Sequence, residues 1–221
     1  MNGMAALLGF HALFGVVAVL ALGFAPAGFY GIAITALVVG YHVALVGWSA
    51  WRRQREWLVL WGFLLPLSLL QVVPDWILVE QIGSLQFFDH GVPRIGAVPV
   101  YMAGMWMIPL FVIVRCADAM PRGGMRPLAA LIAALVVFGA AELLAAPLGL
   151  WAMRGVDEAF MGAALYVLPA EALLGLAAWW GHRLMRGRAW PLRALVAAGI
   201  SVLYTGALIT GYFFIETGAT P

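Results

Sequence analysis

The sequence has no lysine, a single cysteine and few charged residues. All 12 basic residues are arginine, so chemistry that needs a lysine amine, such as a retinal Schiff base, is excluded. Cys116 is the only cysteine, and one thiol forms neither an intrachain disulfide nor a multi-cysteine metal site. We expect neither a metal nor an organic cofactor in this protein.

Charge is scarce because apolar residues dominate. Only 10% of the 221 residues are charged and 65% are hydrophobic, whereas soluble domains carry about 25% charged residues. Several continuous apolar runs have the ~20 residues that a helix needs to cross a ~30 Å hydrocarbon core. Continuous rather than alternating runs favour helices over barrel strands. The sequence therefore predicts one domain, residues 1–221, an all-α integral membrane bundle of about seven transmembrane helices.

The connections between the expected spans are short, with one exception. That exception is residues 81–97, which mix aromatic residues with Asp, His and Arg. Irregular backbone at membrane depth is tolerated only where it is buried or lines a cavity, so we expect this segment to fold back as a re-entrant or interfacial lid. The expected spans are residues 4–24, 29–50, 57–80, 98–116, 127–150, 158–182 and 190–214.

The arginines predict the orientation. Ten of the 12 lie in three connections that share one side, and only Arg94 and Arg154 lie on the other. The positive-inside rule predicts a multi-pass protein of the cell membrane, with a cytoplasmic N-terminus and an extracytoplasmic C-terminus. Arginines at a membrane edge do not indicate a nucleic-acid partner. The ten are Arg52, Arg53, Arg55, Arg115, Arg122, Arg126, Arg183, Arg186, Arg188 and Arg193.

Acidic residues inside the expected spans are the strongest functional candidates. An ionisable side chain at the centre of a membrane helix costs ~2.5–3.5 kcal/mol. Glu171 falls near the centre of the sixth span, while four other acids share the outer half, where the lid adds Asp89, His90 and Arg94. We expect these groups to converge on one site. The four acids are Asp75, Glu80, Glu142 and Glu216.

Each candidate also has a plain structural interpretation. Glu80 and Glu216 stand at span ends, where carboxylates are often only interfacial. Glu142 and Glu171 would otherwise make interhelical hydrogen bonds, and the lid residues would cap a turn. Asp75 and Glu80 are five positions apart, about 140° around a helix, so they share a face only if Pro74 kinks the span. Glu56 and Asp118 read as loop charges.

Aromatic residues accompany these acids, and Trp76, Phe88, Tyr101 and Trp106 are expected to line a pocket with Glu171. Aromatic faces attract cations, and apolar surroundings favour the neutral form of a carboxylic acid. A neutral acid beside an apolar chain is what protonation of an alkene requires. An interfacial aromatic belt is the alternative.

Two histidines suggest a different chemistry. His11 in the first span and His42 in the second fall at similar depth, where two facing imidazoles would hold a haem. A polar contact between adjacent helices is the favoured alternative, and the sequence leaves haem binding open.

A short stretch resembles a family of carotenoid-synthesis membrane proteins. The order runs from Trp76-Ile77-Leu78-Val79-Glu80-Gln81-Ile82-Gly83 through Phe88 to Gly96-Ala97-Val98-Pro99-Val100 and Met105-Trp106-Met107. It resembles the 1,2-hydratases of the bacterioruberin type, in which a Glu-x-x-Gly element precedes an aromatic–Gly loop, a Gly-Val-Pro helix start and a Trp-Met pair. Asp89-His90-Gly91 stands where that family has Gly-x-Tyr-x-Tyr.

The size and helix number also resemble the small membrane-bound terpene cyclases of meroterpenoid and drimane pathways. Those enzymes use an acid after an early helix and another in the last helix, and this resemblance implies Glu80 and Glu216 as the corresponding positions. Both families protonate an isoprenoid double bond or epoxide and then control a carbocation. The resemblance thus implies an isomerase or lyase of isoprenoid biosynthesis that uses general acid catalysis.

We therefore hypothesise an enzyme that acts on a lipophilic prenylated substrate in the membrane by acid-initiated cyclisation or hydration. Glu80, Glu142, Glu216 and Asp75 would be catalytic, and Asp89, His90 and Arg94 would orient them or form the lid. The alternatives are a non-enzymatic lipid-binding or accessory subunit, which predicts no pocket, and a small proton-coupled transporter, which predicts a path to both faces. The oligomeric state stays open.

Overall fold

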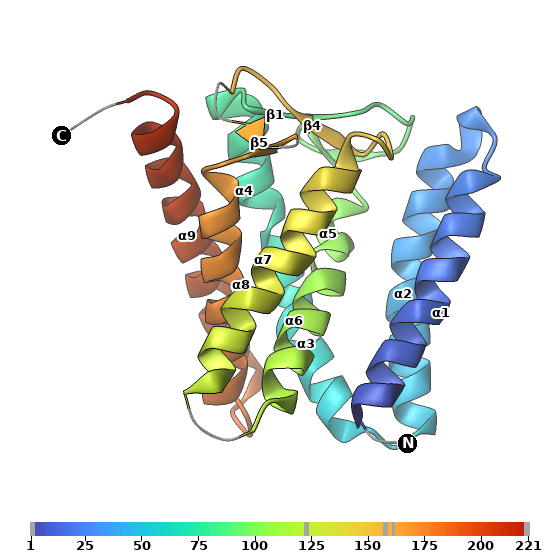
Figure 1. The fold of residues 1–221 in the computed structure, drawn as a ribbon. Helices are drawn as coiled ribbons and strands as arrows, with labels where there is room; N and C mark the ends of the chain where they lie inside the picture. Colours follow the sequence, from blue (N-terminus) through green and yellow to red (C-terminus); the bar gives the residue numbers. More distant parts are fainter. Residues whose placement is uncertain (1–2, 122–123, 157–158, 161, 219–221) are drawn as a thin grey trace.

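A computed structural model describes the chain except residues 1–2, 122–123, 157–158, 161 and 219–221. It is built of helices that run side by side between two ends (Figure 1). A 3-10 turn, Ala27–Phe29, precedes α2, and a π-helical turn, Leu78–Ile82, follows α4. The helices are α1 (Gly3–Gly23), α2 (Tyr30–Trp51), α3 (Arg55–Leu70), α4 (Val72–Ile77), α5 (Met102–Met105), α6 (Met107–Ala119), α7 (Met125–Ala145), α8 (Val167–Leu184) and α9 (Trp190–Ile215).

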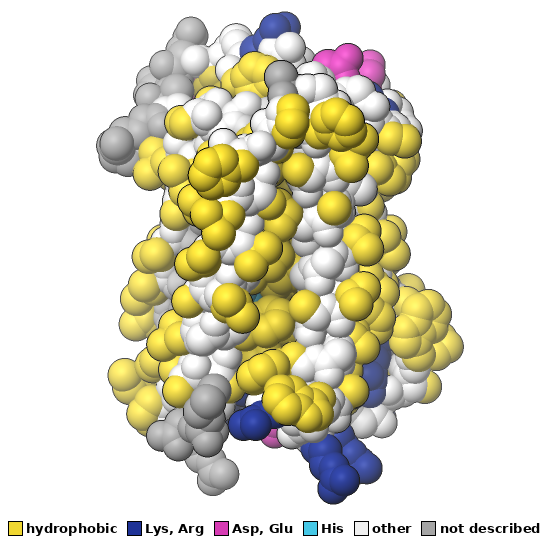
Figure 2. All heavy atoms as spheres, turned by 90° about the vertical axis from the view of Figure 1, so that its right-hand side faces the viewer, with side chains coloured by type: hydrophobic (Ala, Val, Ile, Leu, Met, Phe, Trp, Pro, Cys, Tyr) yellow, Lys and Arg dark blue, Asp and Glu magenta, His cyan; other side chains and the backbone are white. Residues whose placement is uncertain are grey.

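The helices form a membrane bundle. Within the described residues, 6 helical stretches are long and apolar enough to cross a membrane: α1, α2, α3–α4 with the π-helical turn, α5–α6, α7 and α9. The more polar α8 packs between α7 and α9 and completes the bundle. Hydrophobic side chains dominate the α1–α2 face (Figure 2). The prediction of an all-α, multi-pass membrane bundle is confirmed.

The two ends of the bundle differ. At one end α2, α6 and α8 finish and α3, α7 and α9 begin (Figure 1). We call this the arginine end, because all the described arginines except Arg94 and Arg154 belong to these helix ends and their connections. Arg122 lies outside the described residues. The opposite end, where α9 finishes, is called the strand end. The cytoplasmic placement of the arginine end stays a prediction from the positive-inside rule.

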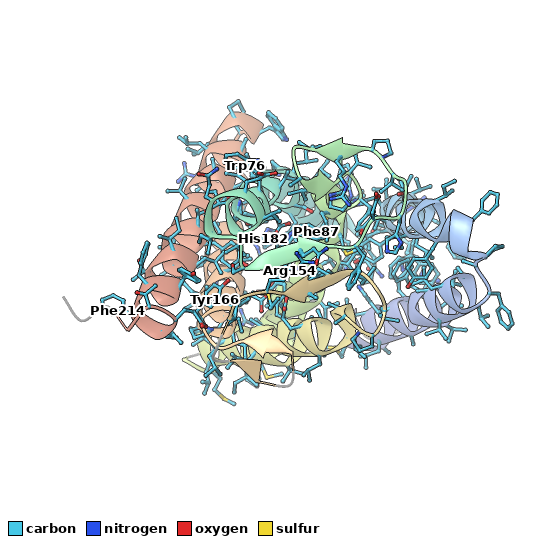
Figure 3. The ribbon with its side chains drawn as sticks, turned by 90° about the horizontal axis from the view of Figure 1, so that it is seen from above. Trp76, Phe87, Arg154, Tyr166, His182 and Phe214 are labelled. Atoms are coloured by element: carbon cyan, nitrogen blue, oxygen red, sulfur yellow. The ribbon has the colours of Figure 1, made fainter. Side chains whose placement is uncertain are left out.

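Short antiparallel strand pairs cover the strand end. β1 pairs with β4 across a long sequence separation, with Leu85 opposite Met153 and Phe87 opposite Trp151. β2 pairs with β3, and β5 with β6. Seen from this end, β1 and β4 cross the bundle, and Phe87 lies near its middle (Figure 3). The strands are β1 (Leu85–Phe87), β2 (Arg94–Ile95), β3 (Val98–Pro99), β4 (Trp151–Met153), β5 (Ala159–Phe160) and β6 (Ala163–Ala164).

Two expected spans are corrected at this end. The span expected at 127–150 ends at Ala145, and the span expected at 158–182 begins only at Val167. Between them the backbone turns at glycines with φ of 64° at Gly149, 59° at Gly155 and 92° at Gly162, a region that glycine adopts readily. Apolar composition continues through these turns, so hydropathy did not reveal them. Glu171 consequently stands near the start of α8 rather than at mid-span.

The third span changes direction just before Asp75. Pro74 has no N–H, so the Leu70 carbonyl loses its helical donor, and the Ser201 hydroxyl of α9 donates to it at 3.3 Å. Two positions before Leu70, the Ser68 hydroxyl donates to the Ala103 carbonyl at 2.9 Å and accepts from the Met107 N–H at 3.0 Å. The kinked span is thereby fixed to α9 and to the α5–α6 junction.

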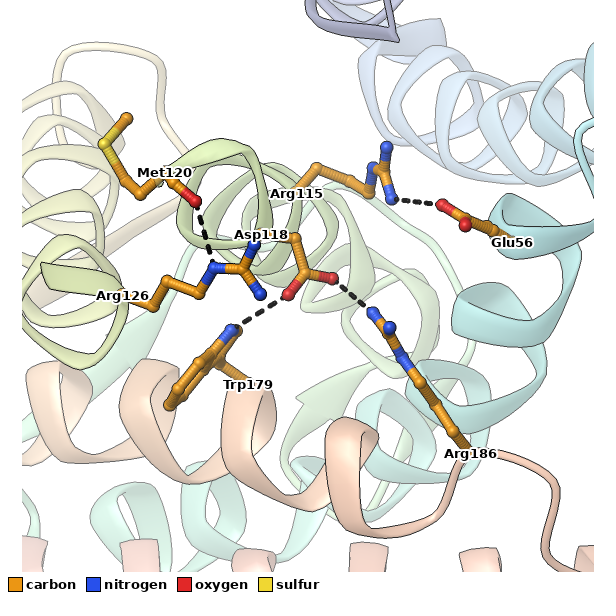
Figure 4. A network of polar contacts seen from close by, with 7 residues as sticks. All are labelled: Glu56, Arg115, Asp118, Met120, Arg126, Trp179 and Arg186. Atoms are coloured by element: carbon orange, nitrogen blue, oxygen red, sulfur yellow. Dashed lines mark hydrogen bonds and ion pairs between the residues drawn. The ribbon is translucent and has the colours of Figure 1, made fainter. Parts of the chain in front are cut away.

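A polar network joins the helices at the arginine end (Figure 4). Asp118 lies on α6, and its carboxylate accepts from Trp179 Nε1 at 3.1 Å and from Arg186 Nη2 at 2.6 Å. Arg115 forms an ion pair with Glu56 at 3.3 Å. The interpretation of Asp118 and Glu56 as plain loop charges is therefore wrong, because Asp118 connects α6 to α8 and Glu56 connects α3 to α6.

Candidate functional site

A cavity of about 440 Å³ lies in the half of the bundle next to the strand end. Its volume falls within the ~300–1,000 Å³ typical of small-molecule sites. Helices α1, α2, α4, α5, α6, α7, α8 and α9 supply its side walls, and β1 and β4 supply Leu85, Phe87, Trp151 and Met153 above it. Apolar side chains form nearly all of this wall.

Three carboxyls from separate helices line the cavity. They are Asp75 on α4, Glu142 on α7 and Glu171 on α8, and the phenol of Tyr204 on α9 joins them. Their exposed fractions are 3%, 8% and 2% for Asp75, Glu142 and Glu171. The bundle thus brings together acids that are far apart in sequence, in buried and largely apolar surroundings.

Two of these carboxyls accept a hydrogen bond from a tryptophan indole. Trp106 Nε1 donates to Asp75 Oδ2 at 2.9 Å, and Trp151 Nε1 donates to Glu142 Oε1 at 3.2 Å. Glu171 differs, because its Oε2 is buried and has no hydrogen-bond partner among the described residues. Glu171 is therefore the acid with a buried oxygen that no described residue satisfies.

Aromatic rings surround the acids. The Trp106 ring lies 5.7 Å from that of Tyr204 and 5.6 Å from that of Phe138, centroid to centroid. No arginine or histidine is among the described residues that line the cavity, and the chain has no lysine. A chamber whose described lining has acids and π faces but no cationic side chain attracts a cation or admits a neutral apolar molecule, and it disfavours anions.

The structure brings together only part of the expected site. Asp75, Glu142, Glu171 and Trp106 line the cavity, but Glu80 and Glu216 do not. Glu80 is exposed in the π-helical turn. It lies five positions after Asp75, so its side chain points to a different side of the helix, and the bend at Pro74 does not return it to the cavity side. Glu216 lies half-buried after the last turn of α9, beyond the cavity wall. The expected convergence of Glu80 and Glu216 with the other acids is thus corrected.

The lid residues bond to the backbone outside the cavity. The exposed Asp89 accepts from the Gly91 N–H at 3.0 Å, with Arg94 at 3.7 Å. The hydrogen bond from this N–H, and secondarily the charge of Arg94, lowers the pKa of the Asp89 carboxyl. The ionised carboxyl therefore stabilises the loop at pH values above the ordinary carboxyl pKa, and this stabilisation is lost as the pH falls through the lowered pKa. Arg94 donates to the Ala97 carbonyl at 2.8 Å, and His90 Nε2 donates to the Gly149 carbonyl at 2.6 Å. These residues fix the loops of the strand end.

Three expected pocket aromatics lie elsewhere. Trp76 is 38% exposed, and its ring covers Gly96, where a Cβ would come within 2.8 Å of it. Phe88 is half-buried and does not line the cavity, whereas its neighbour Phe87 does. Tyr101 is buried below the β2–β3 hairpin, and this burial raises its pKa to about 12. None of the three lines the cavity.

Sequence reasoning missed aromatic residues of the site, among them Trp151 and Phe138. Trp151 belongs to β4, and only its pairing with β1 brings the indole over Glu142. Phe138 is one turn before Glu142 on α7, where it reads as an ordinary apolar helix residue. The spacing of Phe138 and Glu142, four positions, was a usable signal for a shared helix face. No feature of the sequence around Trp151 indicated that it belongs to the site.

Each of the two histidines forms a hydrogen bond to a residue of another helix. His11 Nδ1 faces the Leu7 carbonyl at 2.9 Å and must carry the proton, so Nε2 accepts from the Tyr41 hydroxyl at 3.0 Å. His42 Nδ1 accepts from Trp61 Nε1 at 3.2 Å, and its Nε2 donates to the Gly104 carbonyl at 3.1 Å. All four ring nitrogens are engaged, which favours interhelical contacts over haem ligation.

Comparison with known proteins gives one family. Residues 72–215 match the family described as a domain of unknown function, DUF6989. The match includes all three cavity acids and Tyr204, and it begins after α3. No curated protein and no solved structure matches the chain. Since the matched region is well over half of the chain, this membrane protein belongs to the DUF6989 family.

Proposed function

We propose that this protein is a membrane enzyme that protonates an alkene or epoxide of an isoprenoid chain and then directs cyclisation or hydration. One observation carries the proposal: three carboxyls from α4, α7 and α8 share one largely apolar, aromatic-walled cavity. A carboxylic acid delivers a proton only in its neutral form, and apolar surroundings favour that form. The resemblance to isoprenoid hydratases and cyclases suggests the same class of chemistry.

Glu171 is the proposed acid, because its Oε2 has no partner among the described residues. As its O–H bond breaks, the π electrons of the alkene form a C–H bond, and a tertiary carbocation and a carboxylate remain. Trp106, Tyr204 and Phe138 present rings beside the acids. Such faces stabilise a cation by about 0.5–2 kcal/mol each.

Asp75 and Glu142 are the proposed proton acceptors. The indole N–H groups of Trp106 and Trp151 hold them, and a hydrogen bond of this kind stabilises the ionised form of a carboxyl. In cyclisation, a carboxylate removes a proton from the carbon beside the cation and an alkene forms again. In hydration, water adds to the cation and loses a proton to the carboxylate. Both endings return one proton to Asp75 or Glu142, and transfer of that proton to the Glu171 carboxylate restores the acid, so neither needs a further reactant beyond water.

The shape of the cavity favours this function over the two alternatives. An accessory subunit that uses its acids only for helix contacts requires no pocket. A proton-coupled transporter requires a path to both ends of the bundle, whereas the described lining residues reach no further towards the arginine end than mid-helix positions such as Phe14 and Val112. These observations support an enzyme.

Product analysis with the purified protein in lipid nanodiscs tests the proposal. Prenylated quinones, arenes and alcohols and their epoxides would be offered, and the products compared by mass spectrometry. Loss of a general acid costs ~10²–10⁴-fold in rate, so Glu171→Gln should reduce turnover at least 100-fold. Asp75→Asn and Glu142→Gln should also reduce it, while Glu56→Gln, at the arginine end, should leave it unchanged.

Glu80→Gln decides between the acid implied by the sequence resemblance and the acid chosen from the cavity. We expect it to keep the wild-type products and rate, because Glu80 is exposed outside the cavity. A folded Glu80→Gln protein without activity beside an active Glu171→Gln protein would overturn the assignment to Glu171. A wild-type protein that converts none of the compounds, yet takes them up in response to a proton gradient, would replace the enzyme with a transporter.

A further inference from the structure

We infer that the ligand reaches the cavity from the lipid bilayer, between α1 and α7, and carries no negative charge on the part that meets the acids. The inference rests on the proposed function only for the isoprenoid nature of the chain. Its two parts, the route and the charge, follow from the cavity wall.

The wall between α1 and α7 is open towards the bundle surface. α1 packs on α2 and α6, whereas α7 packs on α6 and α8. Between them the cavity is lined by α7 residues that are themselves exposed, Ala140 and Leu144, the latter at 54%. From α1 the half-buried Ala18 and Leu22 line it. Side chains that border both the cavity and the outer surface mark an opening.

This opening faces lipid. Neighbouring side chains on α1 and α7 are large, apolar and exposed, among them Val19 at 72% and Val136 at 64%. The strand end, by contrast, is roofed by the β1–β4 pair, whose Leu85 and Phe87 are buried over the cavity. A molecule dissolved in the bilayer therefore meets an opening, whereas a molecule arriving from water meets the β1–β4 pair that covers the cavity.

The charges select against an anionic head group. The described lining residues include three carboxyls and no cation, so a diphosphate inside would meet no group that neutralises its charge, and any ionised carboxyl would repel it at short range. Of the two strand-end arginines, Arg94 already donates to the Ala97 and Phe88 carbonyls. Arg154 lies above β4 and does not line the cavity. We therefore assign a neutral prenyl lipid, such as a prenyl alcohol or a prenylated ring, rather than a prenyl diphosphate.

Equilibrium binding tests the charge without requiring turnover. Radiolabelled farnesol and farnesyl diphosphate carry the same apolar chain, and their binding to the protein in nanodiscs would be compared with binding to empty nanodiscs. We expect farnesol to bind at least 100-fold more tightly. Equal or tighter binding of the diphosphate would overturn the charge assignment.

A blocking label tests the route. In a Cys116→Ser background, Ala140→Cys would be labelled with a bulky maleimide, and Val136→Cys, on the same helix but outside the lining, would be the matched control. Labelling at position 140 should slow farnesol binding at least tenfold relative to the same unlabelled protein, with no change at position 136. Unchanged binding at 140 would refute the route, and unlabelled samples report on folding.

The two proposals fail differently. Tight farnesol binding without any product from the prenyl compounds would refute the enzyme and leave the ligand assignment intact. Conversion of prenyl diphosphates in a manner that depends on Glu171 would refute the ligand assignment and leave the acid chemistry intact.

Discussion

Hydrogen-bond partners distinguish the polar residues buried in this bundle. Asp75 and Glu142 each accept from an indole, whereas Glu171 keeps an oxygen without a described partner. Gln71 is the sharper case, because its side chain is 0% exposed and neither amide atom has a described partner. A buried polar group without a hydrogen bond costs about 1–3 kcal/mol.

Replacement of Gln71 by methionine should therefore stabilise the protein. Methionine has a similar length and no amide to desolvate, so we expect a gain of about 1 kcal/mol in the free energy of unfolding. Unfolding titrations in mixed detergent micelles measure this. Gln81→Met, at an exposed position, is the control and should change little. A clear loss of stability in Gln71→Met would show that the amide does make a hydrogen bond.

The hydrogen bond from the Trp106 indole to Asp75 leads to a second prediction about a single residue. Trp106→Phe keeps an aromatic face against Tyr204 and Phe138 but removes the N–H bonded to Asp75. Loss of one hydrogen bond to a carboxyl corresponds to about 1.5–3 kcal/mol, so turnover should fall roughly 10–100-fold. The exposed Trp180→Phe should not affect it. Retention of full turnover in Trp106→Phe would remove the indole from the proposed mechanism.

At the scale of elements, α8 is packed through glycine. A Cβ at Gly175 would lie 2.5 Å from the Ala134 Cβ of α7, and one at Gly181 would lie 2.6 Å from Ile200 Cδ1 of α9. Glycine allows the close approach that holds membrane helices together. This approach also sets Glu171, four positions before Gly175, against the wall formed by α7.

Gly175→Ala should consequently separate α7 and α8. Overfilling a packed contact costs about 1–3 kcal/mol, and we expect that loss in unfolding titrations. Gly206→Ala in α9 is the matched control, because nothing lies within 4 Å of its added Cβ. There alanine should be neutral or should stabilise the helix by up to ~1 kcal/mol. Equal effects at both positions would contradict the close contact.

Asp118 links elements at the opposite end. Asp118→Asn keeps the size of the side chain but removes the charge that pairs with Arg186 across 2.6 Å. Since Arg186 is half exposed, solvent weakens the pair, and we expect a loss of only about 1 kcal/mol. The loss should shrink in high salt. A loss that is independent of salt would assign the effect to Trp179 instead.

At the scale of the whole molecule, the bundle has different ends. α1 begins at the arginine end and α9 finishes at the strand end (Figure 1). The first helix therefore starts and the last helix finishes at opposite ends of the bundle. The positive-inside rule predicts that the arginine end faces the cytoplasm.

Reporter fusions measure this orientation. A fluorescent protein that folds only in the cytoplasm should be active at the N-terminus, and alkaline phosphatase, which needs an oxidising compartment, should be active at the C-terminus. The reverse pattern would place the cavity half next to the cytoplasm and contradict the predicted orientation.

Much of the fold was predictable from the sequence, and less of the site. Asp75, Glu142, Glu171 and Trp106 were expected and line the cavity, whereas Glu80 was expected and does not. The error at Glu80 has a local cause, because Asp75 lies five helical positions away and this spacing turns the Glu80 side chain to the exposed side of the span. Trp151 was missed because its position depends on a strand pairing with β1.

The membrane-spanning helices and the ends that carry the arginines could be identified from the order of residues alone. The spans follow from the summed transfer free energies of about 20 neighbouring residues, and the arginines stand in the connections between them, so no distant contact is needed. Which acids meet depends on the packed helices, because helix rotation, the bend at Pro74, the glycine contact of α8 and the β1–β4 pair act between residues far apart in the chain.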